Sequence, residues 1–407
     1  TLLVGSHGTG KTRLVKSFAK MLYIGDRPVK SFTILLKASH KPIDVFYTYD
    51  LPALMRGEER IVPKAINAEF VFIDEIFANE LILSALKDFL EERIYDRYGV
   101  KWLFFVAGTN PPNDYYQNVL VQRNMADLDR FDVIIPMSIP STMTVNDVLG
   151  DFDEAKSRDM SYEPKVTIDV SNVSKLREEI LTAIKLTDGA RAYLWLMSLA
   201  FSACYYTDNV TGNRVRLDRF NVLERLPCER CIYKKFKLCR YALSPARFMR
   251  ATTFVSKALA WLDNASHADL QHVRIAVKYT LPLRLLPLRE EVKLEAPTIE
   301  ALVQRATSDF EDYLREAGDD VLGMIAEALN QLNKGNFTFR IAARDDPLAR
   351  TIAKDLEAMA KNVKQRLIAT IVNCSDPRLL EPLTQAFDGE IAELARRKLD
   401  ELRGSWS

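Results

Sequence analysis

The sequence has neither a surplus of charge nor a long hydrophobic run. It carries 56 lysine and arginine residues against 55 aspartate and glutamate residues, so no global charge attracts the chain to nucleic acid or anionic lipid. Its most apolar stretch, residues 192–206, is interrupted by Ser198 and Ser202 and is shorter than the roughly 20 residues that span a bilayer. We expect this stretch to form a buried helix.

Cysteine is also scarce. The chain has 5 cysteines, three of them clustered, which favours a reducing compartment over a disulfide framework and leads us to expect a cytoplasmic location. The sequence opens at Thr1 inside a predicted strand, with no signal peptide ahead of it, so we expect it to be part of a longer protein. A length of 407 residues predicts two or three compact domains.

Apolar runs that end in turns and are followed by helical periodicity recur up to about residue 136. This pattern is typical of a parallel sheet with crossover helices, an α/β fold. The predicted strands are residues 1–4, 32–36, 69–73, 101–107 and 133–136. Residues 151–164 are charged and aperiodic, which predicts a linker, and the pattern beyond them is helical. After residue 292 the predicted helices are long and amphipathic.

A phosphate-binding loop follows the first predicted strand and precedes a predicted helix. Its residues match the pattern GxxxxGK[ST]. Glycines allow backbone N–H groups to turn toward phosphate oxygens, and the start of the helix adds a favourable dipole. We expect Lys11 to contact the β- and γ-phosphates of ATP and the Thr12 hydroxyl to bind Mg²⁺. The complete loop is Gly5, Ser6, His7, Gly8, Thr9, Gly10, Lys11 and Thr12.

An acidic pair, Asp74 and Glu75, ends the third predicted strand. Carboxylates at such a position are costly unless they meet a cation or solvent. We expect Asp74 to hold Mg²⁺ and Glu75 to act as general base on the attacking water. Taken alone, the pair is equally consistent with a solvated strand end, and it is the phosphate-binding loop that favours the Walker B interpretation.

Two further polar residues complete the expected site. Asn110 follows the fourth predicted strand, where its amide can bind the γ-phosphate or the lytic water, although Thr-Asn-Pro is also an ordinary turn. Arg130 lies just before the fifth strand, where it could reach the nucleotide of a neighbouring subunit. Without this context, a surface arginine paired with Asp129 or Asp132 is the simpler interpretation.

The motifs together resemble the MoxR group of AAA+ ATPases, over roughly residues 1–285. The similarity extends beyond the nucleotide motifs to the following segments: Thr48-Tyr49-Asp50-Leu51, Phe72-Ile73-Asp74-Glu75-Ile76, Ala85-Leu86, Leu90-Glu91-Glu92-Arg93, Gly108-Thr109-Asn110-Pro111 and Leu128-Asp129-Arg130-Phe131. The resemblance implies an insertion in helix 2 between residues 51 and 63 and a hairpin at 94–101. It also implies a ring, six subunits being the expected number, that remodels or matures protein complexes with a partner bearing a von Willebrand factor A domain.

The residue pattern along the chain predicts three domains, and the resemblance further implies a sensor 2 arginine. We expect an AAA+ nucleotide-binding domain over residues 1–150, an α-helical lid domain over 165–287 and a helical extension over 292–407. The family's sensor 2 opens a lid helix with Ser-Pro-Arg. This chain has Ser244-Pro245-Ala246-Arg247, one residue longer, so Arg247 is the expected sensor 2 and Arg250 the alternative. Either arginine could instead be a solvated helix residue.

A cysteine cluster departs from the family pattern. Cys228, Cys231 and Cys239 lie close together in the lid segment, and Cys204 is the candidate fourth ligand. Four thiolates suit a structural zinc ion or an iron–sulfur cluster, and free thiols or a disulfide are equally open. Cys374 is expected to be a buried apolar residue.

Three classes of function are compatible with these motifs. The first is the protein-remodelling ATPase, which we favour. The second is a nucleic-acid motor, because related helicases share the layout and the lid carries a basic run of Arg214, Arg216, Arg219 and Arg225. The near-neutral charge argues against it. The third is a nucleotide-gated scaffold without hydrolysis, which intact Glu75, Asn110 and Arg130 argue against.

Overall fold

The structure is a computed structural model that describes most of the chain. The described residues are 1–6, 8–92, 94–95, 98–110, 130–137, 166–202, 205–207, 214–216, 232–243, 245–287, 290–318, 320–337, 347–387 and 389–404.

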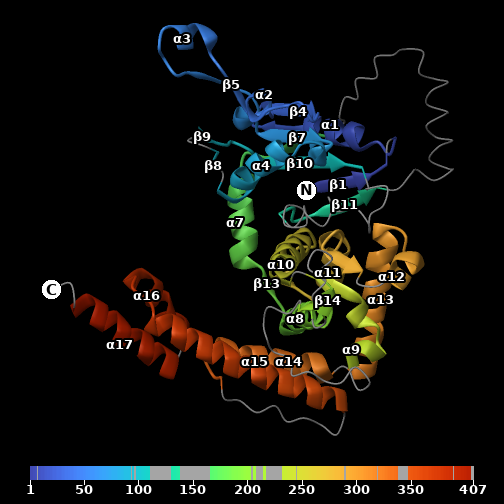
Figure 1. Cartoon of the computed structure of the whole chain (residues 1–407), viewed down its shortest axis with the longest axis vertical. Coiled ribbons are helices and arrows are strands. Elements are labelled where there is room, and N and C mark those ends of the chain that lie inside the picture. Colours follow the sequence, from blue (N-terminus) through green and yellow to red (C-terminus); the bar gives the residue numbers. More distant parts are fainter. Residues whose placement is uncertain are drawn as a thin grey trace.

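A five-stranded parallel sheet forms the centre of the N-terminal part (Figure 1). Its order is β11-β1-β10-β7-β4, so β1 lies between β10 and β11, which are the last two strands of this sheet in chain order. The expected α/β fold with a parallel sheet is confirmed, and each predicted strand is present. The strands are β1 (Leu2–Gly5), β4 (Ser31–Leu35), β7 (Phe70–Asp74), β10 (Phe104–Thr109) and β11 (Ile134–Met137).

Strand β10 begins three residues later than predicted. The side chain of Trp102 is 1% exposed, and its indole N–H donates to the carbonyl oxygen of Ala65 at 2.7 Å. The residues just ahead of β10 therefore bury an aromatic side chain and do not extend the strand. Just before it, β8 (Ile94–Tyr95) and β9 (Tyr98–Gly99) pair antiparallel, as the predicted hairpin requires.

Both faces of the central strands β1 and β7 are buried, which explains their continuous apolar runs. Successive side chains of β7 point to opposite faces. Phe70 and Phe72 pack with α1 (Lys11–Met21), whereas Val71 and Ile73 pack on the other face with α4 (Glu80–Glu92). All four of these side chains are fully buried.

An arm projects from the sheet where the resemblance predicts an insertion (Figure 1). After α2 (Pro42–Val45), the strands β5 (Tyr47–Tyr49) and β6 (Ile61–Pro63) pair antiparallel and carry α3 (Leu51–Met55) between them. The Asp50 carboxylate caps α3 by accepting from the Ala53 N–H at 3.2 Å. Met55 at the end of α3 is 89% exposed, so the arm presents an apolar tip to its surroundings.

The part of the chain beyond residue 166 is mainly helical. The stretch that we expected to form a buried helix lies largely in α8, and its residues 192–201 are all buried except for the half-buried Trp195. The longer helices are α7 (Val173–Ala183), α8 (Asp188–Ser202), α10 (Pro245–Leu262) and α11 (Leu270–Thr280), and the shorter elements are β12 (Ile168–Asp169), β13 (Lys185–Leu186), β14 (Tyr205–Thr207), β15 (Arg214–Arg216), α9 (Ile232–Lys235), β16 (Tyr241–Leu243), β17 (His267–Ala268) and β18 (Leu285–Pro287).

The C-terminal helices divide into two groups. The first group packs on the lid helices: the ring of Phe310 meets the ring of Tyr193 edge-on at 5.2 Å, and the Tyr241 hydroxyl donates to Asp309 at 2.8 Å. The second group forms a separate apolar cluster around Ile371 and Ile391, beyond the lid (Figure 1). The C-terminal helices of both groups are α12 (Glu290–Glu295), α13 (Ile299–Ala317), α14 (Asp320–Asn333), α15 (Pro347–Val372), α16 (Pro377–Ala386) and α17 (Glu390–Gly404).

The expected domain boundaries remain a prediction. Because α13 and α14 share one apolar core with α8, the extension predicted over 292–407 is in part continuous with the lid. Within the described ranges, no helix is both long and apolar enough to cross a membrane.

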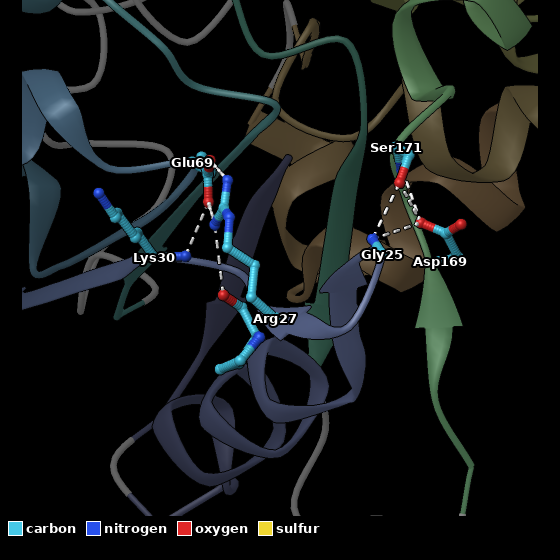
Figure 2. A network of polar contacts seen from close by, with 7 residues as sticks. Gly25, Arg27, Lys30, Glu69, Asp169 and Ser171 are labelled. Carbon is cyan, nitrogen blue, oxygen red and sulfur yellow. Dashed lines mark hydrogen bonds and ion pairs between the residues drawn. The ribbon is translucent and has the colours of Figure 1, made fainter.

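Two polar contacts tie the core to the start of the lid (Figure 2). β12 pairs with β2 (Leu22–Ile24), which forms a hairpin with β3 (Arg27–Pro28). At the hairpin turn, the Gly25 N–H donates to the Ser171 hydroxyl at 3.1 Å and to Asp169 Oδ1 at 3.4 Å. On the adjoining edge, Arg27 forms a two-bond ion pair with Glu69 at 2.5 and 2.8 Å.

The ion pair predicts a pH-dependent contribution to stability. The Arg27 guanidinium, together with the backbone N–H of Lys30, lowers the pKa of Glu69 from 4.5 to about 2. A lowered folded-state pKa stabilises the fold above pH 4.5, and this contribution is lost as the pH falls toward 2. Arg27 is 48% exposed, so we expect Glu69→Gln to cost only about 1–2 kcal/mol at pH 7 and progressively less below pH 4.5.

Urea unfolding at a series of pH values measures this difference. The matched control is Glu58→Gln, because Glu58 and its partner Arg56 are 60% and 59% exposed and such pairs contribute little. A cost for Glu69→Gln that does not change with pH would contradict the linkage.

Candidate functional site

A cavity of about 670 Å³ opens where β1, β7 and β10 end. The predicted phosphate-binding loop forms one side of it, and the acidic pair and Asn110 form the other. His7 of the predicted loop lies outside the described residues. The lining residues are Ser6, Gly8, Thr9, Gly10, Lys11, Thr12, Arg13, Leu35, Leu36, Asp74, Glu75 and Asn110.

The loop adopts the backbone conformation that its glycines permit. Gly8 and Gly10 have φ of 83° and 82°, in the left-handed region where a side chain would be strained. Helix α1 begins directly after Gly10, so its first N–H groups and its dipole face the cavity. The Lys11 ammonium is held under the loop by the carbonyl oxygens of Gly5 at 2.5 Å and Ser6 at 3.2 Å. This arrangement suits a chain of phosphate groups.

The two predicted magnesium-binding residues are in contact. The Thr12 hydroxyl donates to Asp74 Oδ2 at 2.6 Å, and the other oxygen, Oδ1, accepts from the Glu75 N–H at 3.1 Å. Asp74 is 9% exposed, so its carboxylate is directed by these bonds and by the adjoining strand. A hydroxyl and a carboxylate are hard oxygen ligands of the kind that Mg²⁺ prefers beside phosphates. The donor set therefore fits a magnesium–nucleotide complex.

Asn110 links the cationic and the acidic sides of the cavity. Its Oδ1 accepts from the Lys11 ammonium at 3.1 Å, and its Nδ2 donates to Glu75 Oε1 at 2.6 Å. Glu75 itself has φ 55° and ψ 47°, a left-handed conformation that is rare for glutamate. This backbone conformation, directly after the buried strand β7, places the Glu75 carboxylate within reach of Asn110. The predicted general base and the predicted sensor are thus hydrogen-bonded to each other.

Gly108 is a site residue that our sequence reasoning did not single out. A Cβ at this position would lie 2.4 Å from Asp74 Oδ1, because β10 and β7 run side by side in parallel register. Only a glycine leaves room for the carboxylate. Its position two residues before Asn110, on the strand next to Asp74, was the available signal.

Other predicted site residues do not line the cavity. Arg130 is half-buried just before β11, and its Nε and Nη1 atoms are buried, so an action on a neighbouring subunit requires the guanidinium to turn outward. Arg247 lies half-buried in the first turn of α10, and Arg250 is exposed. Of the residues that the structure describes, none from the lid lines the cavity. The roles of Arg130 and Arg247 therefore remain predictions.

The cysteine site is mostly outside the described residues, as Cys204, Cys228 and Cys231 all are. Cys239 is half-buried in a short 3₁₀ helix, Leu238–Arg240. Over the described ranges, no three His, Cys, Asp or Glu side chains converge on a metal position. Cys374, expected to be a buried apolar residue, is half-buried and packs at the edge of the apolar cluster of the last helices.

Comparisons with known proteins agree with this fold. Residues 1–146 match the family model of the AAA domain, dynein-related subfamily. A solved structure that resembles the chain is a candidate ATPase from Cytophaga hutchinsonii, at 17% identity and a TM-score of 0.55, with 76% of this chain and 84% of that chain covered. A search of curated proteins found no match.

These findings define the class of the N-terminal part and then its family. A parallel sheet with a phosphate-binding loop at its carboxyl edge is a P-loop nucleotide-binding fold. More particularly, residues 1–146 are similar to the AAA domain, dynein-related subfamily, and this similarity supports an AAA+ ATPase, for which ATP and Mg²⁺ are the implied ligands. The solved structure extends the likeness of fold beyond this domain, into the helical part.

Gly108→Ala should selectively disturb the magnesium position. The added methyl group would displace the Asp74 carboxylate from the Thr12 hydroxyl, so we expect magnesium-dependent nucleotide affinity to fall roughly tenfold or more, as when oriented metal ligands are lost. Titration of a fluorescent nucleotide with and without Mg²⁺ measures the effect. Gly323→Ala in α14 is the control, because a Cβ there meets nothing within 4 Å. Equal affinities for both variants would refute the role of Gly108.

Proposed function

We propose that this protein is an ATP-hydrolysing ring ATPase of the MoxR kind that remodels or matures protein complexes. The observation that carries the proposal is the hydrogen-bonded series from Lys11 through Asn110 to Glu75, beside the bonded pair of Thr12 and Asp74. Binding of nucleotide alone would need the loop and the metal residues. A carboxylate aligned by a polar amide is required in addition for hydrolysis.

Each residue of the cavity has a distinct role in this mechanism. The loop amides and Lys11 bind the phosphates, and Thr12 and Asp74 hold Mg²⁺, which supplies charge neutralisation when bound. Asn110 orients the attacking water, and Glu75 accepts its proton. When a γ-phosphate occupies the cavity, Lys11 and Asn110 would exchange the hydrogen bond between them for bonds to phosphate oxygens. Asn110 is therefore able to sense the state of the nucleotide.

Arginines outside the cavity are assigned the further stabilisation of the negative charge that develops on the phosphoryl group. We propose that Arg130 reaches the nucleotide of the next subunit and that Arg247, with Arg250 as the alternative, acts from the lid. Such an arginine contributes where negative charge develops on the transferred phosphoryl group. Six subunits remain the proposed number, by resemblance to the MoxR group.

A protein client is favoured over nucleic acid. The near-cancellation of charge argues against a general affinity for phosphate backbones, and Met55 offers an apolar contact at the tip of the projecting arm. Of the basic run in the lid, Arg214 and Arg216 lie in the hairpin of β14 and β15, and Arg219 and Arg225 are outside the described residues. We propose a von Willebrand factor A domain protein as partner, by resemblance, and keep a nucleic-acid motor as the alternative.

Two substitutions separate binding from hydrolysis. Lys11→Ala should abolish ATP binding, because it removes the cation under the phosphates. Glu75→Gln should bind ATP normally and lose about 10²-fold or more in turnover, as removal of a general base does. Nucleotide titration and phosphate release measure the two steps, and wild-type turnover of Glu75→Gln would disprove the assignment. Capture of clients by the same variant from lysate distinguishes protein from nucleic acid.

We also propose a structural zinc ion or iron–sulfur cluster held by Cys204, Cys228, Cys231 and Cys239. The nearby cations Arg230, Lys234, Lys235 and Lys237 favour thiolates, the form that binds metal. Elemental analysis of protein purified without chelator should find metal in the wild type and in Cys374→Ser, but a loss in Cys239→Ser. Zinc would be tetrahedral with Zn–S distances of about 2.3 Å. Less than about a tenth of an equivalent in the wild type would favour free thiols or a disulfide.

A further inference from the structure

A fully buried arginine joins the lid to the AAA domain. Arg284 follows α11 and is 1% exposed. Its Nη1 donates to the carbonyl oxygen of Thr280 at 2.6 Å, at the end of α11, and its Nη2 donates to the carbonyl oxygen of Phe131 at 2.5 Å, in the AAA domain. One planar guanidinium therefore holds two main-chain carbonyls that belong to different parts of the molecule. Such a fixed fork is specific to arginine.

The backbone beside Arg284 is strained in a way that maintains this placement. Leu283 has φ 60°, a conformation that is unusual for a leucine, yet it is 4% exposed and well packed. The turn is closed by the Arg284 N–H, which donates to the carbonyl oxygen of Leu281 at 3.1 Å. Strained backbone persists only where the surroundings enforce it, and it is concentrated at functional positions.

The carbonyl that Arg284 holds belongs to the residue directly after Arg130. On the far side of this short segment, the Leu2 N–H donates to the carbonyl oxygen of Val133 at 2.8 Å, which ties it to β1. The ring of Phe131 stacks on that of Phe105 in β10, with centroids 6.0 Å apart and an angle of 22° between the rings. The backbone that carries Arg130 is thus fixed by β1, by β10, which ends one residue before Asn110, and by the lid.

We infer that Arg284 is a positioning residue for Arg130, through which the lid of one subunit sets the arginine offered to the nucleotide of the next subunit. The inference rests on the proposed action of Arg130 in trans. A shift of the lid relative to the sheet pulls on the Phe131 carbonyl and moves the Arg130 backbone with it. The lid position in one subunit thereby controls hydrolysis in the neighbouring subunit, although Arg284 itself contacts neither nucleotide.

Mixed rings test the two steps separately. The reference mixture combines Lys11→Ala subunits, which offer an intact Arg130, with Arg130→Ala subunits, which offer an intact cavity. Recovered ATPase activity in this mixture supports the trans role of Arg130. Absence of recovery, with mixed rings shown by native mass spectrometry, overturns that role and the present inference together.

Arg284→Lys is then placed in one subunit type at a time. In the Lys11→Ala subunit, it should reduce the recovered activity roughly tenfold to a hundredfold, because a misplacement of about 1 Å has this effect on an aligned group. In the Arg130→Ala subunit, which offers no arginine to position, the recovered activity should stay at the reference level. Arg274→Lys in the Lys11→Ala subunit is the control, since Arg274 of α11 pairs with Glu311 of α13 and not with the AAA domain.

The difference between the two placements distinguishes positioning from structural damage. Equal loss in both placements, or loss in neither, overturns the inference. If Arg284→Lys subunits do not enter rings, Arg284→Gln is used in the same two placements, because its amide keeps one donor for the Phe131 carbonyl. Failure of both variants to enter rings assigns Arg284 a purely structural role and overturns the inference.

Discussion

The parallel alignment of β1, β10 and β7 is the constraint on which the candidate site depends. In this register Leu2 lies beside Ala107, and Ala107 lies beside Ile73. Parallel strands that start level also end level, so the loop after Gly5, the carboxylate of Asp74 and the amide of Asn110 meet at one edge. Antiparallel pairing would place alternate strand ends on opposite sides of the molecule. The burial of β1 and β7 on both faces holds this alignment.

Charged side chains at this edge of the sheet make it suitable for binding a nucleotide. Lys11, 7% exposed, and Asp74, 9% exposed, are charged groups that would be costly to bury without partners. Main-chain carbonyls and Asn110 satisfy the ammonium, and the Thr12 hydroxyl and the Glu75 N–H satisfy the carboxylate. Of these groups, the Lys11 ammonium, the Thr12 hydroxyl and the Asp74 carboxylate are of the chemical kinds that a magnesium–triphosphate group would contact.

The helical half of the chain contributes by packing. Helix α8 is buried between the other lid helices and α13, where Tyr193 and Phe201 contact Phe310. The Glu311 carboxylate receives bonds from Tyr193 and from Arg274, and the low dielectric of this position together with Glu311 raises the pKa of the Tyr193 hydroxyl far above its usual value. The lid and the first C-terminal helices consequently share one packed core. The proposed positioning of Arg130 through Arg284 therefore involves this whole core.

Much of this protein was determined by local sequence. The GxxxxGK[ST] loop, the acidic pair after an apolar strand and the alternation of strands and helices predicted the fold and the nucleotide residues, because each depends on the backbone preferences and polarity of a few neighbouring residues. The late start of β10 and the role of Gly108 were decided by tertiary contacts, with Ala65 and Asp74 respectively. The burial of Arg284 against Phe131 was decided in the same way, since 153 residues separate the two. No local pattern encodes contacts over such distances in the chain, because they exist only once the lid has packed against the sheet.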